Sequence, residues 1–178
     1  MFFPSFSNSK SPWPTTIPPA VGRAVRIEIQ RSVRDEAGDA AHAATFVRER
    51  RIVLEEALIA DADEFARIFV HELFHFVWLR LGNRKRRSFE RLLAGELRRG
   101  VRGELGWSAE WRKERLDPRD WRERTRRWRD YCCESFCDTA AWRYAGVKKH
   151  AEFTLAAAAR RARGEWFARE GVDEGIAI

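Results

Sequence analysis

Hydrophobic and polar residues alternate in the first third of the chain. The segment RAVRIEIQR at residues 23–31 has an apolar β-branched residue at every second position, and residues 44–48 and 51–55 alternate in the same way. A period of two is typical of strands with one buried face. These segments predict a small sheet of about three strands.

After residue 60 the hydrophobic period lengthens to that of an α-helix. Asp61 and Glu64 form a capping box that predicts a helix over about residues 62–81, ended by Gly82. A second long helix is expected over about residues 118–144, because an Asp-Pro pair is a strong helix start and a glycine follows the last periodic residue. Shorter helices are expected over residues 88–99, from residue 108, and over residues 154–169. The predicted fold class is α+β, with the sheet followed by four or five helices.

The two ends of the chain differ from this pattern. Residues 1–22 hold five of the six prolines and predict an extended N-terminal arm, while residues 23–178 form one predicted domain with a frayed tail over residues 171–178. No basic segment leads into an unbroken apolar stretch, so we expect neither a secretory signal nor a membrane span. Three cysteines lie within six residues, an odd number that argues for a reducing cytoplasm over a disulfide framework.

The chemistry of the chain is concentrated in the middle of the first predicted long helix. The sequence His71-Glu72-Leu73-Phe74-His75 places two histidines four residues apart, and therefore on one helical face, among uncharged neighbours. This spacing suits a single zinc ion held by two imidazoles, with Glu72 beside it to act on a bound water. The motif uses two of the four histidines and predicts a zinc site.

A catalytic zinc usually has a third protein ligand. The second long helix offers Glu134 and Asp138, which share one face in an otherwise uncharged stretch and need a cation or donor as compensation. Glu134 on the metal and Asp138 on the second ring nitrogen of a ligating histidine would satisfy both carboxylates. Cys137 on the same turn is an alternative ligand, which would make the site more structural than hydrolytic.

An HExxH helix followed by a later helix with the pattern ExxxD resembles the gluzincin branch of the zincin metallopeptidases. The resemblance implies a zincin-like fold with His71, His75 and Glu134 as zinc ligands and Glu72 as general base. It also implies that Asp138 orients the first histidine, and that the strand over residues 51–56 is the edge strand along which an extended substrate lies.

Members of that branch commonly add a tyrosine or histidine that stabilises the oxyanion. The candidates for this role are Tyr131, Tyr144 and His150. Tyr131 is the first choice, because it lies one turn before Glu134 on the same helical face. Packing of Tyr131 in the core is the alternative interpretation.

The net charge of +7 is concentrated in one segment. Residues 84–129 contain 17 Lys and Arg against 8 Asp and Glu, a net charge of +9, with four tryptophans interleaved. Trp107 and Trp111 are four apart and Trp121 and Trp128 seven apart, so each pair is expected to face the core while the arginines form a solvated face. Recognition of an acidic partner or substrate is the first alternative, and binding of nucleic acid is the second.

Together these features predict a zinc-dependent peptidase of the bacterial cytoplasm that acts on a peptide or protein substrate; an acidic substrate is the alternative that the basic segment leaves open. Two other functions stay open: a catalytically silent, zinc-stabilised regulatory or interaction module, and a basic nucleic-acid-binding protein in which the HExxH motif is incidental. The sequence does not indicate the cleaved bond or the oligomeric state.

Overall fold

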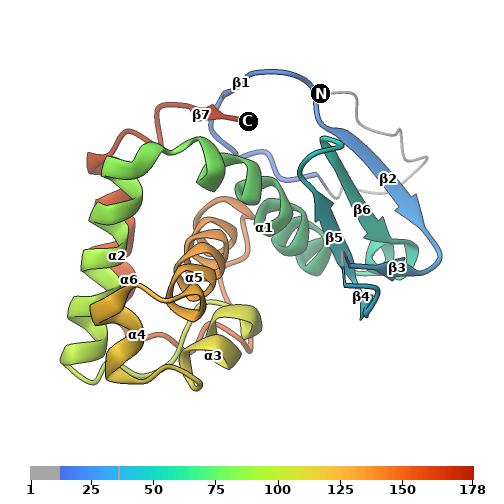
Figure 1. Cartoon of the computed structure of the whole chain (residues 1–178). Helices are drawn as coiled ribbons and strands as arrows, with labels where there is room; N and C mark the ends of the chain where they lie inside the picture. The colour runs from blue at the N-terminus through green and yellow to red at the C-terminus, as the bar shows by residue number, and fades with distance from the viewer. Residues whose placement is uncertain (1–12, 36) are drawn as a thin grey trace.

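Three strands form the main sheet of the computed structural model, which describes residues 13–35 and 37–178 (Figure 1). Strand β6 (Arg51–Glu55) lies between β2 (Arg26–Gln30) and β5 (Ala43–Phe46), parallel to the first and antiparallel to the second. The predicted sheet of about three strands is therefore confirmed. Residues 51–56 were expected to form an edge strand, and this is wrong: β6 is central, and β5 is an edge strand of the sheet.

Two short strand pairs accompany the sheet. Strands β3 (Val33–Arg34) and β4 (Ala40–Ala41) are antiparallel, while β1 (Ala20–Val21) pairs in parallel with β7 (Ile176–Ala177). The expectation of a frayed tail is wrong, because β7 in the tail pairs with β1 and the Ile176 side chain is only 2% exposed.

The predicted N-terminal arm is described only from residue 13 onward, and residues 1–12 lie outside the described residues. Trp13 packs edge-on against Phe65 and Phe69, with ring centroids 4.9 and 5.0 Å away. This part of the arm therefore covers the first helix.

Six α-helices are present in the described part of the chain, preceded by a short 3₁₀ helix, η1 (Glu56–Ala60). They are α1 (Ala62–Arg80), α2 (Gly82–Arg98), α3 (Trp107–Lys113), α4 (Pro118–Glu123), α5 (Arg126–Tyr144) and α6 (Ala157–Arg169). The predicted helix over residues 118–144 is two helices. Arg124 adopts a left-handed conformation with φ of 54°, and Thr125 caps the new helix by accepting from the Trp128 amide. No helix of the described residues is long and apolar enough to span a membrane.

Helix α1 starts where the sequence predicts and ends one residue earlier. The Asp61 side chain accepts from the amides of Asp63 and Glu64, both at 3.1 Å, and Gly82 with φ of 75° turns the chain into α2. Figure 1 shows α1 between the sheet and α5, with the other helices around α5. The two predicted ligand helices are thus packed side by side.

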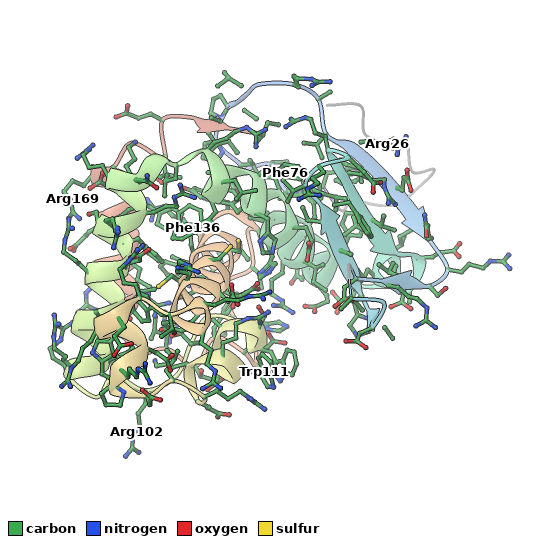
Figure 2. The ribbon with its side chains drawn as sticks, in the orientation of Figure 1. Arg26, Phe76, Arg102, Trp111, Phe136 and Arg169 are labelled. Atoms are coloured by element: carbon green, nitrogen blue, oxygen red, sulfur yellow. The ribbon has the colours of Figure 1, made fainter. Side chains whose placement is uncertain are left out.

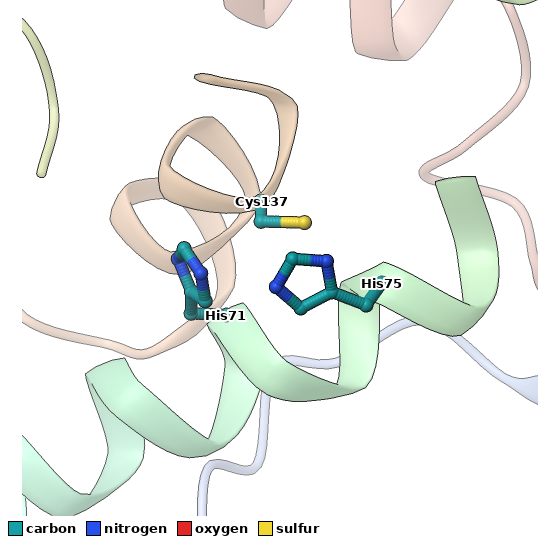
Figure 3. A group of neighbouring side chains, drawn as sticks. All are labelled: His71, His75 and Cys137. Carbon is teal, nitrogen blue, oxygen red and sulfur yellow. The ribbon is translucent and has the colours of Figure 1, made fainter. Parts of the chain in front are cut away.

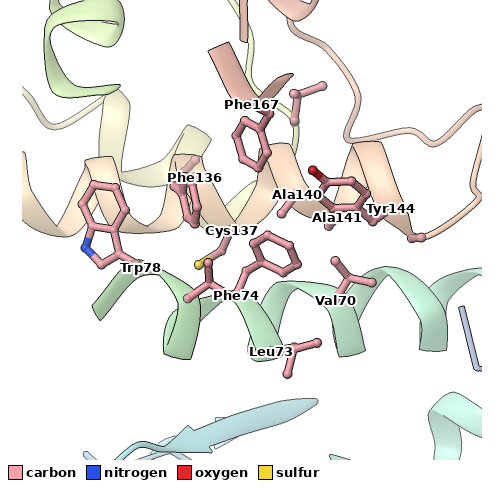
Figure 4. Close-up of a cluster of buried hydrophobic side chains, with 14 of the residues drawn as sticks. Val70, Leu73, Phe74, Trp78, Phe136, Cys137, Ala140, Ala141, Tyr144 and Phe167 are labelled. Carbon is pink, nitrogen blue, oxygen red and sulfur yellow. The ribbon is translucent and has the colours of Figure 1, made fainter. Parts of the chain in front are cut away.

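The core between α1 and α5 explains their close approach. Figure 4 shows Val70 and Phe74 of α1 facing Cys137 and Ala140 of α5, and all four side chains are buried. Small residues on α5 allow the helix backbones to come near, and large aromatic rings fill the space farther along. Figure 2 shows Arg26, Arg102 and Arg169 extending from the periphery, while Phe136 points inward. Arg67 and Arg163 are buried.

Candidate metal centre

The two histidines of the HExxH motif converge with a thiol from the neighbouring helix. His71 and His75 of α1 and Cys137 of α5 each offer a ligand atom, and these atoms all lie within 4.8 Å of one another. Figure 3 shows the two imidazoles and the thiol directed toward a common space. Residues from α1 and α5 thus form one candidate metal centre.

Both ring nitrogens of His71 have carboxylate neighbours. Nδ1 donates to Asp138 Oδ1 at 2.7 Å, and Nε2 lies 3.3 Å from Glu134 Oε2. In a tetrahedral zinc site with bonds of about 2.0–2.1 Å, two ligand atoms are separated by about 3.3–3.4 Å. The His71 and Glu134 atoms therefore have the spacing of two zinc ligands, and Asp138 fixes the ring so that Nε2 is the ligating nitrogen.

Two cysteines lie on the other side of His75. Cys133 Sγ is 3.5 Å from His75 Nδ1. The hydrogen bond with Cys137 lowers the pKa of Cys133 to about 6; burial opposes this change, and the nearby His75 reinforces it. Among the described residues, the group whose ligand atoms all lie within 4.8 Å of one another is His71, His75 and Cys137; Glu134, the third ligand expected from the sequence, contacts His71 but is not part of that group. Glu134 and Cys137 are thus the two candidates for the third ligand.

Glu134 is held by the short helix α3. Its Oε2 accepts from the Ser108 hydroxyl, and its Oε1 lies 3.5 Å from Arg112 Nη2. Burial favours the neutral acid, but the hydrogen bond with His71 and the charges of His75, His71 and Arg112 outweigh it and hold the pKa of Glu134 well below its usual value. Glu134 is therefore an ionised carboxylate in a buried position, which is suited to a cation.

Asp138 is anchored by the same helix. Its second carboxylate oxygen accepts from the Ala109 amide at 3.1 Å. Gly106 packs so closely that a Cβ there would lie 2.2 Å from the Asp138 carboxyl carbon. A side chain at position 106 would therefore displace the carboxylate that orients His71.

The proposed general base is tied to the edge strand. The Thr45 hydroxyl of β5 donates to Glu72 Oε2 at 2.6 Å, and the Glu72 side chain is one of the charges that raise the pKa of His75. Glu72 is 9% exposed. The Glu72 carboxylate is thus held against β5.

Tyr131 does not occupy the position expected of an oxyanion-stabilising residue. Its side chain is fully buried, and its hydroxyl donates to Glu104 at 2.6 Å in a cluster that also contains Arg163. Burial and the Glu104 charge raise the Tyr131 pKa well above its usual value. The expected catalytic role is therefore wrong, and the alternative interpretation of a core residue is confirmed.

The two other candidates for this role are also engaged elsewhere. The Tyr144 hydroxyl donates to Asp173, and its ring stacks on Phe74. His150 Nε2 lies 3.2 Å from Glu64 Oε2, near the start of α1. Arg112 instead places a guanidinium beside Glu134.

Three residues that contact the site could not be identified from the sequence. Thr45, Ser108 and Arg112 lie 27, 26 and 22 residues from the side chains they touch. No local spacing in the sequence links Ser108 to Glu134. Contacts of this kind depend on how α3 and β5 pack against α1 and α5.

Comparison of the chain with protein-family models, curated proteins and solved structures gives no match. Any function proposed for the protein therefore depends on the geometry of this centre.

Proposed function

We propose that the protein is a zinc-dependent peptidase of the gluzincin type, with His71, His75 and Glu134 as zinc ligands. The observation that carries the proposal is the pair of contacts made by the His71 ring, Nδ1 to Asp138 at 2.7 Å and Nε2 to Glu134 at 3.3 Å. Zinc bound there would polarise a peptide carbonyl and lower the pKa of an attacking water.

In this mechanism Glu72 moves the proton. Its carboxylate accepts a proton from the attacking water and later delivers it to the leaving amine. Thr45 holds the Glu72 carboxylate through a 2.6 Å hydrogen bond, which limits its side-chain freedom. Arg112 contacts the other oxygen of the proposed ligand Glu134 at 3.5 Å and would hold that carboxylate in place.

The edge strand supports a polypeptide substrate. Strand β5 pairs with β6 along one side only and carries Thr45, which contacts Glu72. An extended peptide that pairs with the other side of β5 would pass close to the general base, since added strands bind by main-chain hydrogen bonds. We propose cleavage of a peptide or protein substrate in the cytoplasm.

The position of Cys137 favours one other function. With His71, His75 and Cys137 as its protein ligands, the centre would hold zinc for stability, as a regulatory or interaction module without turnover. The two proposals predict different effects of single substitutions on zinc binding.

Metal analysis of purified variants tests the ligand set. We expect about one zinc per wild-type chain, a large loss in Glu134→Ala, and retention in Cys137→Ala. The opposite result would establish the thiolate site. Cobalt substitution gives an independent measurement, since only a thiolate ligand produces intense sulfur-to-metal charge-transfer absorption.

Hydrolysis is tested separately with a peptide library prepared from a digested bacterial proteome and analysed by mass spectrometry. Zinc-loaded wild-type protein should produce new termini that disappear with a chelator and in Glu72→Gln. Glu165→Gln, an exposed carboxylate on α6, is the matched control and should cleave normally. Cleavage by Glu72→Gln at the wild-type rate would refute the role of the base.

A further inference from the structure

Helix α3 carries an exposed pair of tryptophans. Trp107 is 64% exposed and Trp111 is 38% exposed, with their rings stacked at a centroid distance of 6.1 Å. The expectation that this pair faces the core is wrong, because α3 buries Ala109 on its other side. For the second pair, Trp128 is buried as expected and Trp121 is partly buried.

The exposed pair continues into a cation. The Arg115 guanidinium lies 4.1 Å from the centre of the Trp111 ring, and its Nη1 donates to the Trp111 carbonyl oxygen. Trp107 and Trp111 lie four residues apart on one side of α3, and Arg115, in the turn that follows the helix, folds back onto the Trp111 ring. We call these three residues the α3 aromatic surface. In Figure 2, Trp111 extends from the side of α3 nearest β4 and β5.

This surface lies directly beside the candidate metal centre. Ser108 and Arg112, which alternate with the tryptophans in sequence, both contact Glu134, and the Ala109 amide contacts Asp138. A molecule held on the tryptophans therefore binds to the same short helix that contacts Glu134 and Asp138. Exposed aromatic side chains that form a continuous patch commonly mark a binding surface.

The charges on the surface indicate the chemistry of the occupant. Arg115 has no carboxylate within 4.0 Å among the described residues, so its charge is available. Arg112 is engaged with Glu134 and Lys113 with Glu104. One free cation next to two indole rings matches an apolar or aromatic side chain with a carboxylate near it. A nucleic acid would require a longer row of free cations along its backbone.

We propose that the α3 aromatic surface binds the substrate polypeptide through an aromatic side chain packed on Trp107 and Trp111 and a neighbouring carboxylate on Arg115. The inference rests on the proposed function and specifies its substrate: a peptide with adjacent aromatic and acidic residues. The basic segment around α3 attracts such a peptide, because its net charge is +9 over residues 84–129.

Binding is measured by isothermal titration calorimetry in zinc-loaded Glu72→Gln, which prevents cleavage. The probe is an acetylated, amidated pentapeptide with the sequence Gly-Phe-Asp-Asp-Gly, compared with Gly-Ala-Asp-Asp-Gly, Gly-Phe-Lys-Lys-Gly and an eight-nucleotide oligothymidylate. We expect a Kd on the order of 0.1–1 mM for the first peptide, and binding at least about fivefold weaker for each of the other two peptides.

The variant Trp107→Ala/Trp111→Ala should weaken binding of the first peptide at least about fivefold, and Arg115→Gln should remove the preference for Asp over Lys. The matched control is Val21→Ala, because Val21 is 66% exposed and lies on β1. Melting temperatures within about 2 °C of the parent exclude a folding effect, as expected for exposed positions.

Unchanged affinity in Trp107→Ala/Trp111→Ala would overturn the inference, as would tighter binding of the oligothymidylate through the same tryptophans. Failure of the proposed function is a different result: intact peptides after incubation with wild-type, zinc-loaded protein. The two failures are therefore distinguishable, since binding is read in a variant that is not required to hydrolyse.

Discussion

Replacement of Arg163 by methionine should destabilise the protein more than most single substitutions. Arg163 of α6 is fully buried and donates to Glu96 of α2 and to Glu104, each at a shortest distance of 2.7 Å. Both carboxylates are also fully buried. Methionine has a similar length but no charge, so the substitution leaves two carboxylates that neither water nor the guanidinium can stabilise.

The expected cost follows from the charges that remain. Breaking a buried ion pair by removing one partner costs about 3–5 kcal/mol, because an uncompensated charge stays in the interior. Lys113 still lies 3.2 Å from Glu104, and Tyr131 still donates to it. The substitution therefore removes more of the stabilisation of the Glu96 charge than of the Glu104 charge. At about 2–4 °C per kcal/mol for a chain of this size, the melting temperature should fall by about 6–20 °C.

Urea denaturation followed by circular dichroism measures the effect. Arg161→Met, an exposed arginine on the same helix, is the matched control and should change the unfolding free energy by less than about 0.5 kcal/mol. Addition of Glu96→Gln to Arg163→Met should recover part of the loss, since it removes the least compensated charge. A loss below about 1 kcal/mol in Arg163→Met would refute the reasoning.

Three further predictions test other parts of the structure. Asp138→Asn should weaken zinc binding about 10–100-fold in a chelator competition, since Asp138 orients His71, and unchanged affinity would contradict that role. Burial raises the pKa of Glu104, but the charge and hydrogen bonds of Arg163, the charge of Lys113 and the hydrogen bond from Tyr131 prevail and lower it to about 2. The resulting stabilisation, about 3 kcal/mol, is complete above the ordinary value near 4.5 and is lost as the pH falls toward 2, so an acid titration of the unfolding free energy should be flatter in Glu104→Gln. Ile176→Ala should cost about 2–5 kcal/mol in urea denaturation because the side chain is buried, whereas a cost typical of a surface site would mean that the C-terminal strand is not docked.

Local spacing explains the features that could be predicted from the sequence. The alternation around β2, β5 and β6 depends only on neighbouring residues, as does the cap at Asp61. The HExxH and ExxxD patterns each place their members on one helical face by the geometry of a single helix. These predictions needed no knowledge of how the elements pack. The contact between His71 and Asp138 was the exception, because it required two helices to be neighbours.

Predictions that depended on tertiary packing were less successful. Strand order cannot be read from hydrophobic alternation, and β6 proved to be central although it directly precedes the helical part of the chain. The spacing of Trp107 and Trp111 identified a common face but not its direction, and α3 turns that face outward. Tyr131 shares a helix with Glu134, yet its hydroxyl reaches Glu104, which lies in the loop before α3.

The environment of His75 bears on the choice between the two ligand sets. Figure 3 shows one ring nitrogen of His75 directed toward His71 and the other toward Cys137. The latter is Nδ1, which Cys133 approaches at 3.5 Å, just as Asp138 approaches Nδ1 of His71. Because both Nδ1 atoms are contacted in this way, the two Nε2 atoms are left as the candidate metal-ligating nitrogens. The Glu134 carboxylate lies beside Nε2 of His71. The Cys137 thiol, by contrast, lies within 4.8 Å of ligand atoms of both histidines, so the carboxylate and the thiol compete for the third ligand position and the pair Glu134→Ala and Cys137→Ala distinguishes them.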